Sequence, residues 1–567
     1  MNRCRKYLFL GILPVISFYL MELYEHNPWV EVRGQAQFFN IILFEAFVWI
    51  LYLVTGRVRP ALLTELVLSM VFGLVNHYVM LFRSTPFVPW DLYSVKTAYS
   101  VVGNYEFTWE PRVAWVTVGF LGLILLTAVY GEGKDRKIAS FRKRLPFALI
   151  LIGSLGLFVR NLQKEDFQVR HHLYPYLFTP AYMTQVNGMA VTFTINLQYL
   201  MVEKPAGYDP EECEEYLQNY ASTSVADTQF PNLLVIMDEA FSDLSILGDF
   251  EVNEDYMPFM HSQQEKGNNT VTGMATVSVC GGNTANSEFE FLTANTMEYL
   301  PSGSIPYQQY IKKETPSLAW YLQSLGYETY AQHPYYATGW NRNQVYPWLG
   351  FSRVDFLEDY KKRHTLRGYV SDASDMQHII DTFEQKESGK PIFLFNVTMQ
   401  NHGGYTKEYP NFTNTIQADC DSEPLNQYLT LLKKTDESLE ELIAYFSKVE
   451  EPTMIVFFGD HQPNDFLVRP IWKRNGVDDN NLSPEQQKLR YQVPYLIWAN
   501  FELEEEQDKN LRLNELGALV LQKAGIPLDS YRRFMVEENI ASMPYEQCSL
   551  YKKLQYYMLF DAKEFKK

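Results

Sequence analysis

The sequence is poor in cysteine and in net positive charge. Its five cysteines, at positions 4, 213, 280, 420 and 548, are widely scattered and form no CxxC pair, which predicts that no disulfide framework holds the chain together. No internal repeat or low-complexity tract is evident in the 567 residues. The formal net charge of −18 argues against nucleic acid as a partner.

Charge divides the chain into two unlike parts. Residues 1–200 carry 18 Lys and Arg against 12 Asp and Glu, whereas the remainder carries 31 against 55. An acidic part of this size is not attracted to anionic surfaces in general. Any anionic substrate that it binds must therefore be held by a few local cations or by a metal ion.

Five apolar runs lie in the first part, at residues 7–21, 38–55, 61–82, 113–130 and 145–159. The first and last are shorter than the roughly 20 residues that span a bilayer, and flanking residues complete them. The first run is followed by Glu22 rather than by a small-residue cleavage site, so it differs from a signal peptide. These runs predict a five-helix transmembrane domain over residues 1–164.

Basic residues predict the orientation of these helices. The N-terminus and the second and fourth loops carry eleven Lys and Arg, whereas the opposite short loops carry four, Arg33, Arg83, Lys96 and Arg112. Basic loops stay in the cytoplasm. The N-terminus is therefore predicted to be cytoplasmic, and everything after the fifth span is predicted to be extracellular.

Residues 165–204 are rich in aromatic side chains and are predicted to be a linker at the membrane interface. Beyond them, residues 205–567 contain short, continuous apolar runs at 232–237, 392–398, 453–458 and 495–499. Continuous apolarity is typical of strands that are buried on both faces of a parallel sheet, and helical patterns such as residues 425–449 separate these runs. The second part is therefore predicted to be an α/β domain.

Polar residues follow the predicted strands at their carboxyl ends. Glu239 follows the first run, His402 the second and the pair Asp460-His461 the third, and a shorter β-like stretch at 327–332 ends before His333. Binding sites in open α/β sheets form at these ends. One such cluster could be ordinary turn chemistry, but four on one edge indicate a site.

Thr284 is the predicted nucleophile. It follows the pair Gly281-Gly282, and the apolar residues from Phe289 onward predict a helix that starts at Thr284. A helix N-terminus offers unpaired N–H groups and a partial positive charge, which suit an anionic phosphoryl group. From this segment alone, an N-cap role for Thr284 is the alternative interpretation.

Three further residues complete a candidate metal site with Thr284. Glu239, Asp460 and His461 supply oxygen and nitrogen ligands, and the mixed, oxygen-rich set suits Mn or Mg, with Zn as an alternative. A coordinated hydroxyl loses its proton more readily, which makes threonine a usable nucleophile. Taken one at a time, these carboxylates could instead be solvated loop residues, and the histidine could be a hydrogen-bonded residue without a metal.

The order of these motifs resembles the lipoteichoic acid synthase family, a membrane-anchored branch of the alkaline phosphatase and sulfatase superfamily. The matching segments are NLLVIMDEAFSDL, GGNTANSEFEFLT, GWNRNQVYPWLGF, NVTMQNHGGY and FFGDHQP, with RSTPFVPWDL after the third span. The five spans match as well, so the resemblance covers nearly the whole chain.

The resemblance implies two sets of site residues. One divalent ion, Mn in the first place, would be held by Glu239, Thr284, Asp460 and His461. A phosphoglycerol headgroup would be surrounded by His333, Trp340, Arg342 and His402. Arginine can grip a phosphate with two N–H groups, histidine can protonate a departing alkoxide, and Trp340 can form an apolar wall, with core packing as its alternative role.

Two departures from the family pattern bear on function. Tyr335 stands where a smaller or acidic polar residue is expected, two places after His333, which predicts different headgroup or acceptor contacts. No small-residue cleavage motif lies between the last span and the second domain. Sulfatase chemistry is set aside, because Cys280 is followed by Gly-Gly-Asn-Thr rather than by the C/S-x-P-x-R context that formylglycine formation needs.

The sequence thus predicts a phosphoglycerol transferase on the outer face of a bacterial membrane. Thr284 would attack phosphatidylglycerol, release diacylglycerol and pass phosphoglycerol to a glycerophosphate polymer, a glycolipid or a wall glycan. One alternative is a phosphoethanolamine transferase that uses phosphatidylethanolamine. Others are a phosphodiesterase that uses water and a catalytically silent membrane scaffold or sensor.

Overall fold

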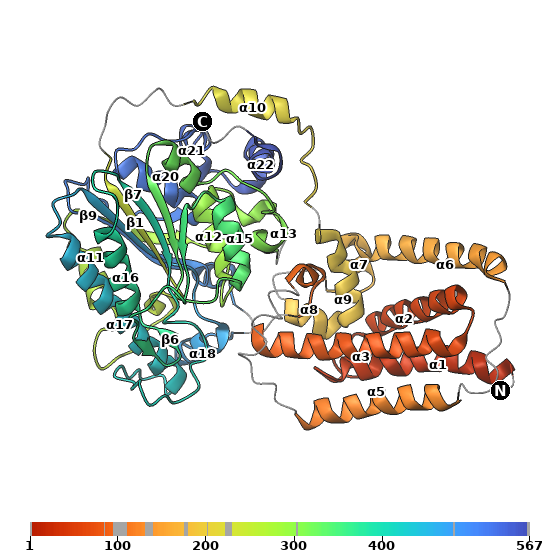
Figure 1. Cartoon of the computed structure of the whole chain (residues 1–567). Helices are drawn as coiled ribbons and strands as arrows, with labels where there is room; N and C mark the ends of the chain where they lie inside the picture. Colours follow the sequence, from red (N-terminus) through yellow and green to blue (C-terminus); the bar gives the residue numbers. More distant parts are fainter. Residues whose placement is uncertain are drawn as a thin grey trace. The chain divides into compact units, whose positions relative to one another are not determined.

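The computed structural model describes residues 3–83, 86–94, 110–130, 140–174, 180–200, 202–221, 230–301, 304–479 and 482–563 (Figure 1). The chain divides into two compact units. The N-terminal unit is mainly Met1–Val202, and the C-terminal unit comprises Glu203–Leu300 and Ile305–Lys567.

The described part of the N-terminal unit is helical. Its longer helices are α1 (Arg3–Glu22), α2 (Gly34–Thr55), α3 (Val58–Arg83), α5 (Pro111–Tyr130) and α6 (Phe141–Leu162). Four helical segments are long and apolar enough to cross a membrane, namely Gly34–Thr55, Val58–Leu81, Pro111–Val129 and Phe141–Leu162. They identify a membrane protein. The apolar helix Tyr7–Glu22 is shorter, so its role as a fifth span stays a prediction.

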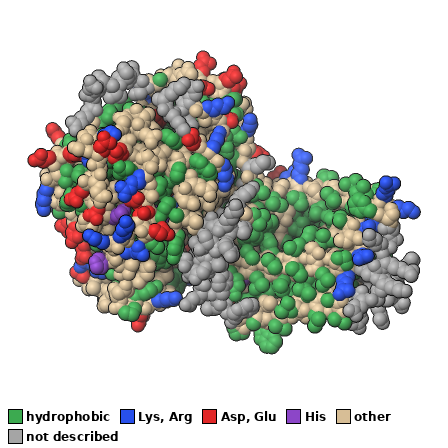
Figure 2. Space-filling model, in the orientation of Figure 1, with side chains coloured by type: hydrophobic (Ala, Val, Ile, Leu, Met, Phe, Trp, Pro, Cys, Tyr) green, Lys and Arg blue, Asp and Glu red, His purple; other side chains and the backbone are tan. Residues whose placement is uncertain are grey.

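Apolar side chains cover the surface of these helices. Trp115 and Leu125 on α5 and Phe147, Ile150 and Leu157 on α6 are each 64–74% exposed. Figure 2 shows hydrophobic side chains over most of the visible face of this unit. Contiguous apolar surface of this extent is unfavourable in water and typical of contact with lipid.

Residues 165–204, the predicted interfacial linker, form short helices in their described parts. These are α7 (Glu165–Arg170), α8 (Pro180–Asn187), α9 (Met189–Asn196) and the 3-10 helix η3 (Leu197–Leu200). Buried apolar residues such as Met183, Val191 and Ile195 pack with Phe39 of α2 and Leu162 of α6. The segment therefore belongs to the packed helical unit, and its position at a membrane interface stays a prediction.

The C-terminal unit is built on an eight-stranded sheet with the order β10-β2-β9-β8-β1-β7-β3-β4. The strands are β1 (Asn232–Asp238), β2 (Thr270–Thr276), β3 (Glu328–Gln332), β4 (Arg353–Asp355), β7 (Ile392–Val397), β8 (Thr453–Gly459), β9 (Gln492–Ala499) and β10 (Leu511–Arg512). A separate two-stranded hairpin is formed by β5 (Thr365–Leu366) and β6 (Tyr369–Val370).

The predicted strands are present, but one runs in the opposite direction. β1 pairs in parallel with β7 and β8, and β3 pairs in parallel with β7 and β4. β9 is antiparallel to β8 and to β2, so the parallel strand predicted at residues 495–499 is wrong in direction. Burial on both faces produces continuous apolarity whichever way a strand runs.

Helices cover both faces of the sheet. Ile236, Leu394 and Phe457 point to one face, where they form a core with α11 (Pro258–Lys266), α16 (Asp372–Glu384), α17 (Glu423–Phe446) and α18 (Asp465–Arg474). On the other face, Phe291 of α12 (Thr284–Thr293) packs on Phe395 and Phe458. Helix α12 also contacts α20 (Leu513–Lys523) on this face.

Shorter elements complete the C-terminal unit. They are α10 (Pro210–Gln218), α13 (Pro306–Gln309), α14 (Leu318–Ser324), α15 (Arg342–Trp348), α19 (Pro484–Leu489), α21 (Ser530–Glu537) and α22 (Ser549–Tyr556). The predicted fold class, membrane helices followed by a mostly parallel α/β domain, is confirmed. The extracellular location of that domain stays a prediction.

Candidate active site

The central strands bring their carboxyl ends to one edge of the sheet. The neighbours β8, β1, β7 and β3 run in parallel, so the residues that follow them lie side by side. Asp238 at the end of β1 accepts hydrogen bonds from Thr398 at 2.9 Å and from Asn401 at 2.8 Å. These bonds tie the ends of β1 and β7 together and leave the next residue, Glu239, to face the site.

Glu239, Asp460 and His461 form a cluster suited to a divalent cation. One ligand atom from each lies within 4.8 Å of the others, and all three residues are buried. The His461 Nε2 atom is 3.2 Å from Asp460 Oδ2 and 3.8 Å from Glu239 Oε1. Burial and then the nearby Asp460 raise the pKa of Glu239 well above its ordinary value. A bound cation would offset this repulsion between carboxylates.

The surroundings orient two of these ligand atoms toward one another. His461 donates from Nδ1 to the Gln462 carbonyl at 2.9 Å, which leaves the Nε2 lone pair for a cation. The Ala240 N–H binds Asp460 Oδ1 at 2.7 Å. Asp460 Oδ2 and His461 Nε2 are buried and have no hydrogen-bond partner in the described part of the chain. Buried polar atoms without partners are costly, so the residues present fit a metal ion.

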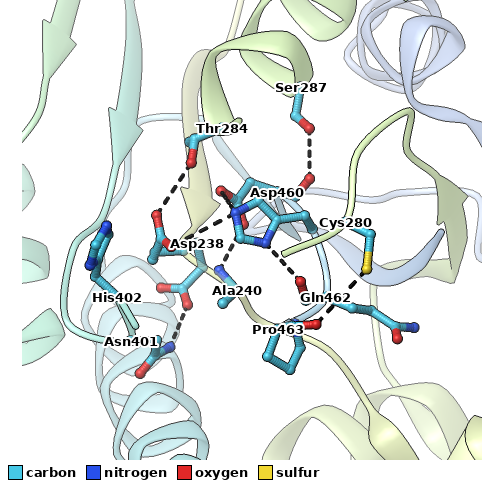
Figure 3. A network of polar contacts seen from close by, with 12 residues as sticks. Asp238, Ala240, Cys280, Thr284, Ser287, Asn401, His402, Asp460, Gln462 and Pro463 are labelled. Carbon is cyan, nitrogen blue, oxygen red and sulfur yellow. Dashed lines mark hydrogen bonds and ion pairs between the residues drawn. The ribbon is translucent and has the colours of Figure 1, made fainter. Parts of the chain in front are cut away.

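Thr284 points its hydroxyl at this cluster. It is the first residue of α12, and its Oγ1 donates to Glu239 Oε2 at 3.3 Å (Figure 3). The residue before it, Asn283, is the N-cap and has the left-handed φ of 67°. The alternative N-cap role for Thr284 is therefore wrong, because Asn283 occupies the N-cap position and the Thr284 side chain contacts the carboxylate cluster.

Ser287 is held away from the site chemistry. Its hydroxyl donates to the Asp460 carbonyl at 2.6 Å, and the residue has no exposed surface (Figure 3). This bond fixes α12 against the end of β8. Gly281, with φ of 72°, allows the preceding loop to pass the Asn464 backbone, where an added Cβ would lie 3.2 Å from the Asn464 Cα.

Arg342 is part of a buried network that the sequence did not reveal. Its Nε donates to Glu288 Oε1 at 2.9 Å, its Nη2 binds the same oxygen, and Tyr346 donates to Glu288 Oε2 at 2.8 Å. Burial opposes the charged form of Arg342, but Glu288 raises its pKa above the ordinary value. Much of the predicted phosphate-gripping edge of Arg342 is therefore occupied by Glu288.

His333 supports Arg342 from the other side. Its Nδ1 lies 2.8 Å from the Val397 carbonyl, so Nδ1 carries the proton, and its Nε2 lies 3.0 Å from Arg342 Nη1. Burial and then Arg342 lower the pKa of His333 well below its ordinary value. In this structure His333 positions Arg342, and its predicted headgroup contact stays a prediction.

Replacing Glu288 tests this network. Glu288→Gln should lower kcat/KM for the reaction at this site by about 100-fold, because Arg342 loses its charged partner and its fixed position. Kinetics at varied substrate concentration would separate KM from kcat. Glu290→Gln is the matched control, since Glu290 lies two residues further along α12 and binds the Met297 N–H at 2.9 Å. Wild-type kinetics for folded Glu288→Gln would contradict the positioning role.

The β5–β6 hairpin holds the loop that carries His402. Arg367, in the turn of the hairpin, donates from Nη2 to the carbonyls of Gln400 at 2.7 Å and His402 at 2.8 Å. Tyr369 places its hydroxyl 3.1 Å from His402 Nδ1. The sequence pattern did not predict a role for Arg367 or Tyr369. The basic run at residues 361–364 was the only nearby feature that pointed to this loop.

His402 is an exposed residue, and the pKa of its imidazole is nevertheless lowered. Desolvation, followed by the nearby His461 and Arg367, lowers the pKa of His402 to about 4. This lowering favours the neutral form of His402 in the free protein. The predicted protonation of a leaving group requires an anionic phosphoryl group beside His402, which would raise this pKa again.

Trp340 lies in the loop between β3 and α15 with an unusual backbone. Trp340 and Asn341 have φ of 54° and 59°, and Trp340 is half-buried. A left-handed conformation is strained for a bulky side chain, and such strain clusters at binding sites. The predicted contact of Trp340 with a headgroup stays a prediction, with core packing as the alternative role.

The sequence of the C-terminal unit matches a known protein family. Residues 231–526, just over half of the chain, match the family described as Sulfatase. The chain belongs to the sulfatase family. In this chain the hydroxyl that faces the Glu239, Asp460 and His461 cluster is that of a threonine, Thr284.

Curated relatives of this sulfatase-family protein include cell-envelope proteins. It is 28% identical over 499 residues to the "Putative cyclic beta-1,2-glucan modification protein" of Rhizobium meliloti, which covers 85% of this chain and 75% of the relative. It is 22% identical over 399 residues to "Lipoteichoic acid synthase 1" of Bacillus subtilis, covering 66% and 60%. The resemblance to the lipoteichoic acid synthases is thereby confirmed.

A solved structure supports the fold of the sulfatase-family unit. The Streptococcus pyogenes phosphoglycerol transferase GacH, in complex with sn-glycerol-1-phosphate, superposes with a TM-score of 0.52 and 22% identity. The match covers 63% of this chain and 94% of that one. Burial raises the pKa of the Cys280 thiol to about 11, which disfavours the nucleophilic thiolate.

Proposed function

We propose that this protein transfers phosphoglycerol from phosphatidylglycerol to a cell-surface acceptor through a covalent intermediate on Thr284. The observation that carries the proposal is the Thr284 hydroxyl, buried at the start of α12 and 3.3 Å from Glu239 in the Glu239, Asp460 and His461 cluster. A nucleophile beside a cation site and a helix N-terminus suits attack on an anionic phosphorus.

The residues divide the first step among them. A divalent cation held by Glu239, Asp460 and His461 would lower the pKa of the attacking hydroxyl and offset phosphate charge. Thr284 releases its hydroxyl proton to solvent, and its Oγ1 forms a bond to phosphorus as the bond from phosphorus to the diacylglycerol oxygen breaks. His402, protonated beside the bound phosphoryl group, gives its proton to that oxygen, and diacylglycerol leaves.

Arg342 contributes by position as well as charge. Glu288, which Tyr346 fixes in turn, and His333 hold its guanidinium, so little conformational freedom is lost when an anionic group binds nearby. In the second step an acceptor hydroxyl attacks the phosphorus, and Thr284 is released. The membrane helices keep such a site near a lipid donor.

The names of the relatives support a transfer reaction in the cell envelope. One relative is named for glucan modification and another for lipoteichoic acid synthesis. Both names fit an acceptor that is a glycan or a glycerophosphate polymer. Manganese is the proposed metal, since the donor set contains more oxygen than nitrogen, with Mg or Zn as alternatives.

Mass spectrometry of the acid-quenched protein tests the donor and the mechanism together. Full-length protein in nanodiscs is incubated with Mn and either phosphatidylglycerol or phosphatidylethanolamine. A phosphoglycerol increment on the Thr284 peptide is expected with the first lipid. A phosphoethanolamine increment instead would assign the alternative donor, and release of free glycerophosphate without any acceptor transfer would assign a phosphodiesterase.

The proposed orientation is tested separately. A reporter fused after Lys567 should be accessible only from outside the cell, because eleven basic residues lie on the proposed cytoplasmic loops against four on the others. An N-terminal reporter serves as the control and should be accessible only after the membrane is permeabilised. A cytoplasmic C-terminal reporter would refute the orientation and with it the access to an outer-leaflet donor.

A further inference from the structure

Three tyrosine rings extend from the site along the β3–α15 loop and the hairpin. Tyr335 and Tyr336 have ring centroids 4.7 Å apart, and Tyr335 lies 6.0 Å from Tyr369. Tyr369 in turn lies 5.2 Å from His402. The rings of Tyr335, Tyr336 and Tyr369, here called the tyrosine wall, therefore form a continuous series that ends at His402.

The tyrosine wall is rigidly held. Tyr335 donates from its backbone N–H to the His333 carbonyl at 2.7 Å and accepts from the Leu357 N–H at 3.1 Å. The Gly339 N–H binds the Tyr336 carbonyl at 3.0 Å. Tyr369 belongs to β6, which pairs with β5. A preformed surface of this kind loses little conformational entropy when it binds a ligand.

The wall offers ring faces rather than a closed core. All three tyrosines are half-buried, so each keeps part of its surface accessible. Adjacent rings are inclined by 62° and 49°, which makes an angled surface instead of one packed stack. Tyrosine combines an apolar face with a polar tip, and such residues suit ligands that carry both kinds of surface.

A neutral sugar ring has both kinds of surface. Its C–H groups form an apolar face that lies on an aromatic ring, and its hydroxyls stay at the edge of that contact. A glycerophosphate polymer is instead a flexible polyanion that needs exposed cations. Arg367 lies 5.6 Å from the Tyr369 ring and is a single buried cation; its Nη2 donates to backbone carbonyls, and its Nε and Nη1 have no hydrogen-bond partner among the described residues. The basic residues 361–363 are accompanied by Glu358 and Asp359.

We propose that the tyrosine wall is the acceptor subsite and that it binds a neutral glycan. This inference rests on the proposed function, since it assigns the acceptor of the same transfer. The wall ends at His402, so a sugar on Tyr335 and Tyr369 brings a hydroxyl toward the reacting side of the site. It also accounts for Tyr335 at the position where the sequence departs from the family pattern.

The second step transfers phosphoglycerol from Thr284 to a hydroxyl of the glycan. The oxygen of a sugar hydroxyl forms a bond to the phosphorus of phosphoglyceryl-Thr284 as the bond from phosphorus to Thr284 Oγ1 breaks. The hydroxyl proton passes to neutral His402 and from there to the departing Thr284 oxygen. The products are the phosphoglycerol ester of the glycan and the original threonine.

The test separates the two half-reactions. Full-length protein in phosphatidylglycerol nanodiscs with Mn is given either a neutral β-glucan oligosaccharide or a short glycerophosphate oligomer. Tyr335→Ala is expected to raise KM for the glucan by about tenfold, while the Thr284 adduct still forms. Tyr335→Phe should restore the glucan KM to within about twofold, because it keeps the ring face.

A control variant outside the tyrosine wall makes the expected result specific. Tyr445→Ala, which removes a half-buried tyrosine of α17 bonded to Glu384, should leave both acceptor constants unchanged. Tyr336→Ala provides a second wall variant if Tyr335→Ala does not fold. An unchanged glucan KM in folded wall variants would overturn the inference, and a raised KM for the glycerophosphate oligomer alone would assign the wall to a polyanion.

Direct binding separates this inference from the proposed function. The glucan should bind Thr284→Ala in calorimetry, and Tyr335→Ala in that background should weaken binding by about tenfold. If wild-type protein forms no adduct on Thr284 while this binding pattern holds, the proposed function fails and the glycan subsite stands. If the adduct forms but no wall-dependent glucan binding is seen, the subsite fails alone.

Discussion

Thr284→Ala is expected to remove turnover and adduct formation while lipid binding remains measurable. In the proposed mechanism the hydroxyl makes its decisive bond only in the transition state, whereas Arg342, His402 and a bound cation would interact with the phosphoryl group already in the ground state. The loss should therefore fall on kcat and reach at least about 10³-fold, with a much smaller change in KM. Steady-state kinetics with labelled phosphatidylglycerol would measure both constants.

Two companion variants make this result specific. Thr284→Ser should keep partial activity, because it retains the oxygen and loses only the methyl group that restrains χ1. Thr293→Ala makes the same substitution at the other end of α12, where the hydroxyl binds the Phe289 carbonyl, and should keep turnover. An active Thr284→Ala protein, or an adduct on Ser278 or Ser287, would mean that another residue is the nucleophile.

Substitution of the metal ligands should have the second largest effect. Glu239→Gln, Asp460→Asn and His461→Ala should each lose the bound cation and nearly all turnover, since one missing ligand forfeits most of the affinity of such a site. Metal content can be measured by mass spectrometry of the purified protein. Because burial and Asp460 raise the pKa of Glu239, protons compete with the cation, and metal content should fall as pH is lowered.

Thermal unfolding adds a readout that does not depend on activity. Mn at 100 times its dissociation constant should stabilise the wild type by about 2.7 kcal/mol and should not stabilise the three variants. Without metal, Glu239→Gln should be at least as stable as the wild type, because it removes one of two close carboxylates. The matched control is Asp375→Asn, a buried carboxyl of α16 bonded to Tyr360 and Asn396.

The control should retain both metal content and the response to Mn, even if its baseline stability falls. If two of the three ligand variants kept normal metal content and turnover, the cation would have to be held elsewhere. Loss of activity with normal metal content would instead indicate that the cluster serves catalysis without holding the ion.

The sequence by itself determined the features that depend on local pattern. Continuous apolar runs marked β1, β7, β8 and β9, because strands buried on both faces need apolar side chains at every position. The same logic placed Glu239, Asp460 and His461 at strand ends. The Gly-Gly pair before Thr284 marked the start of α12, since the tight turn there needs the left-handed backbone of Gly281.

Only the tertiary structure decided the partners of these residues. Glu288 meets Arg342 across 54 positions of sequence, and Tyr369 meets His402 across 33. No periodicity encodes such pairs, because they form only when separate strands and loops reach the same edge of the sheet. The direction of β9 and the tyrosine wall could not be predicted for the same reason. An apolar or aromatic residue indicates burial, but it does not indicate which distant segment packs against it.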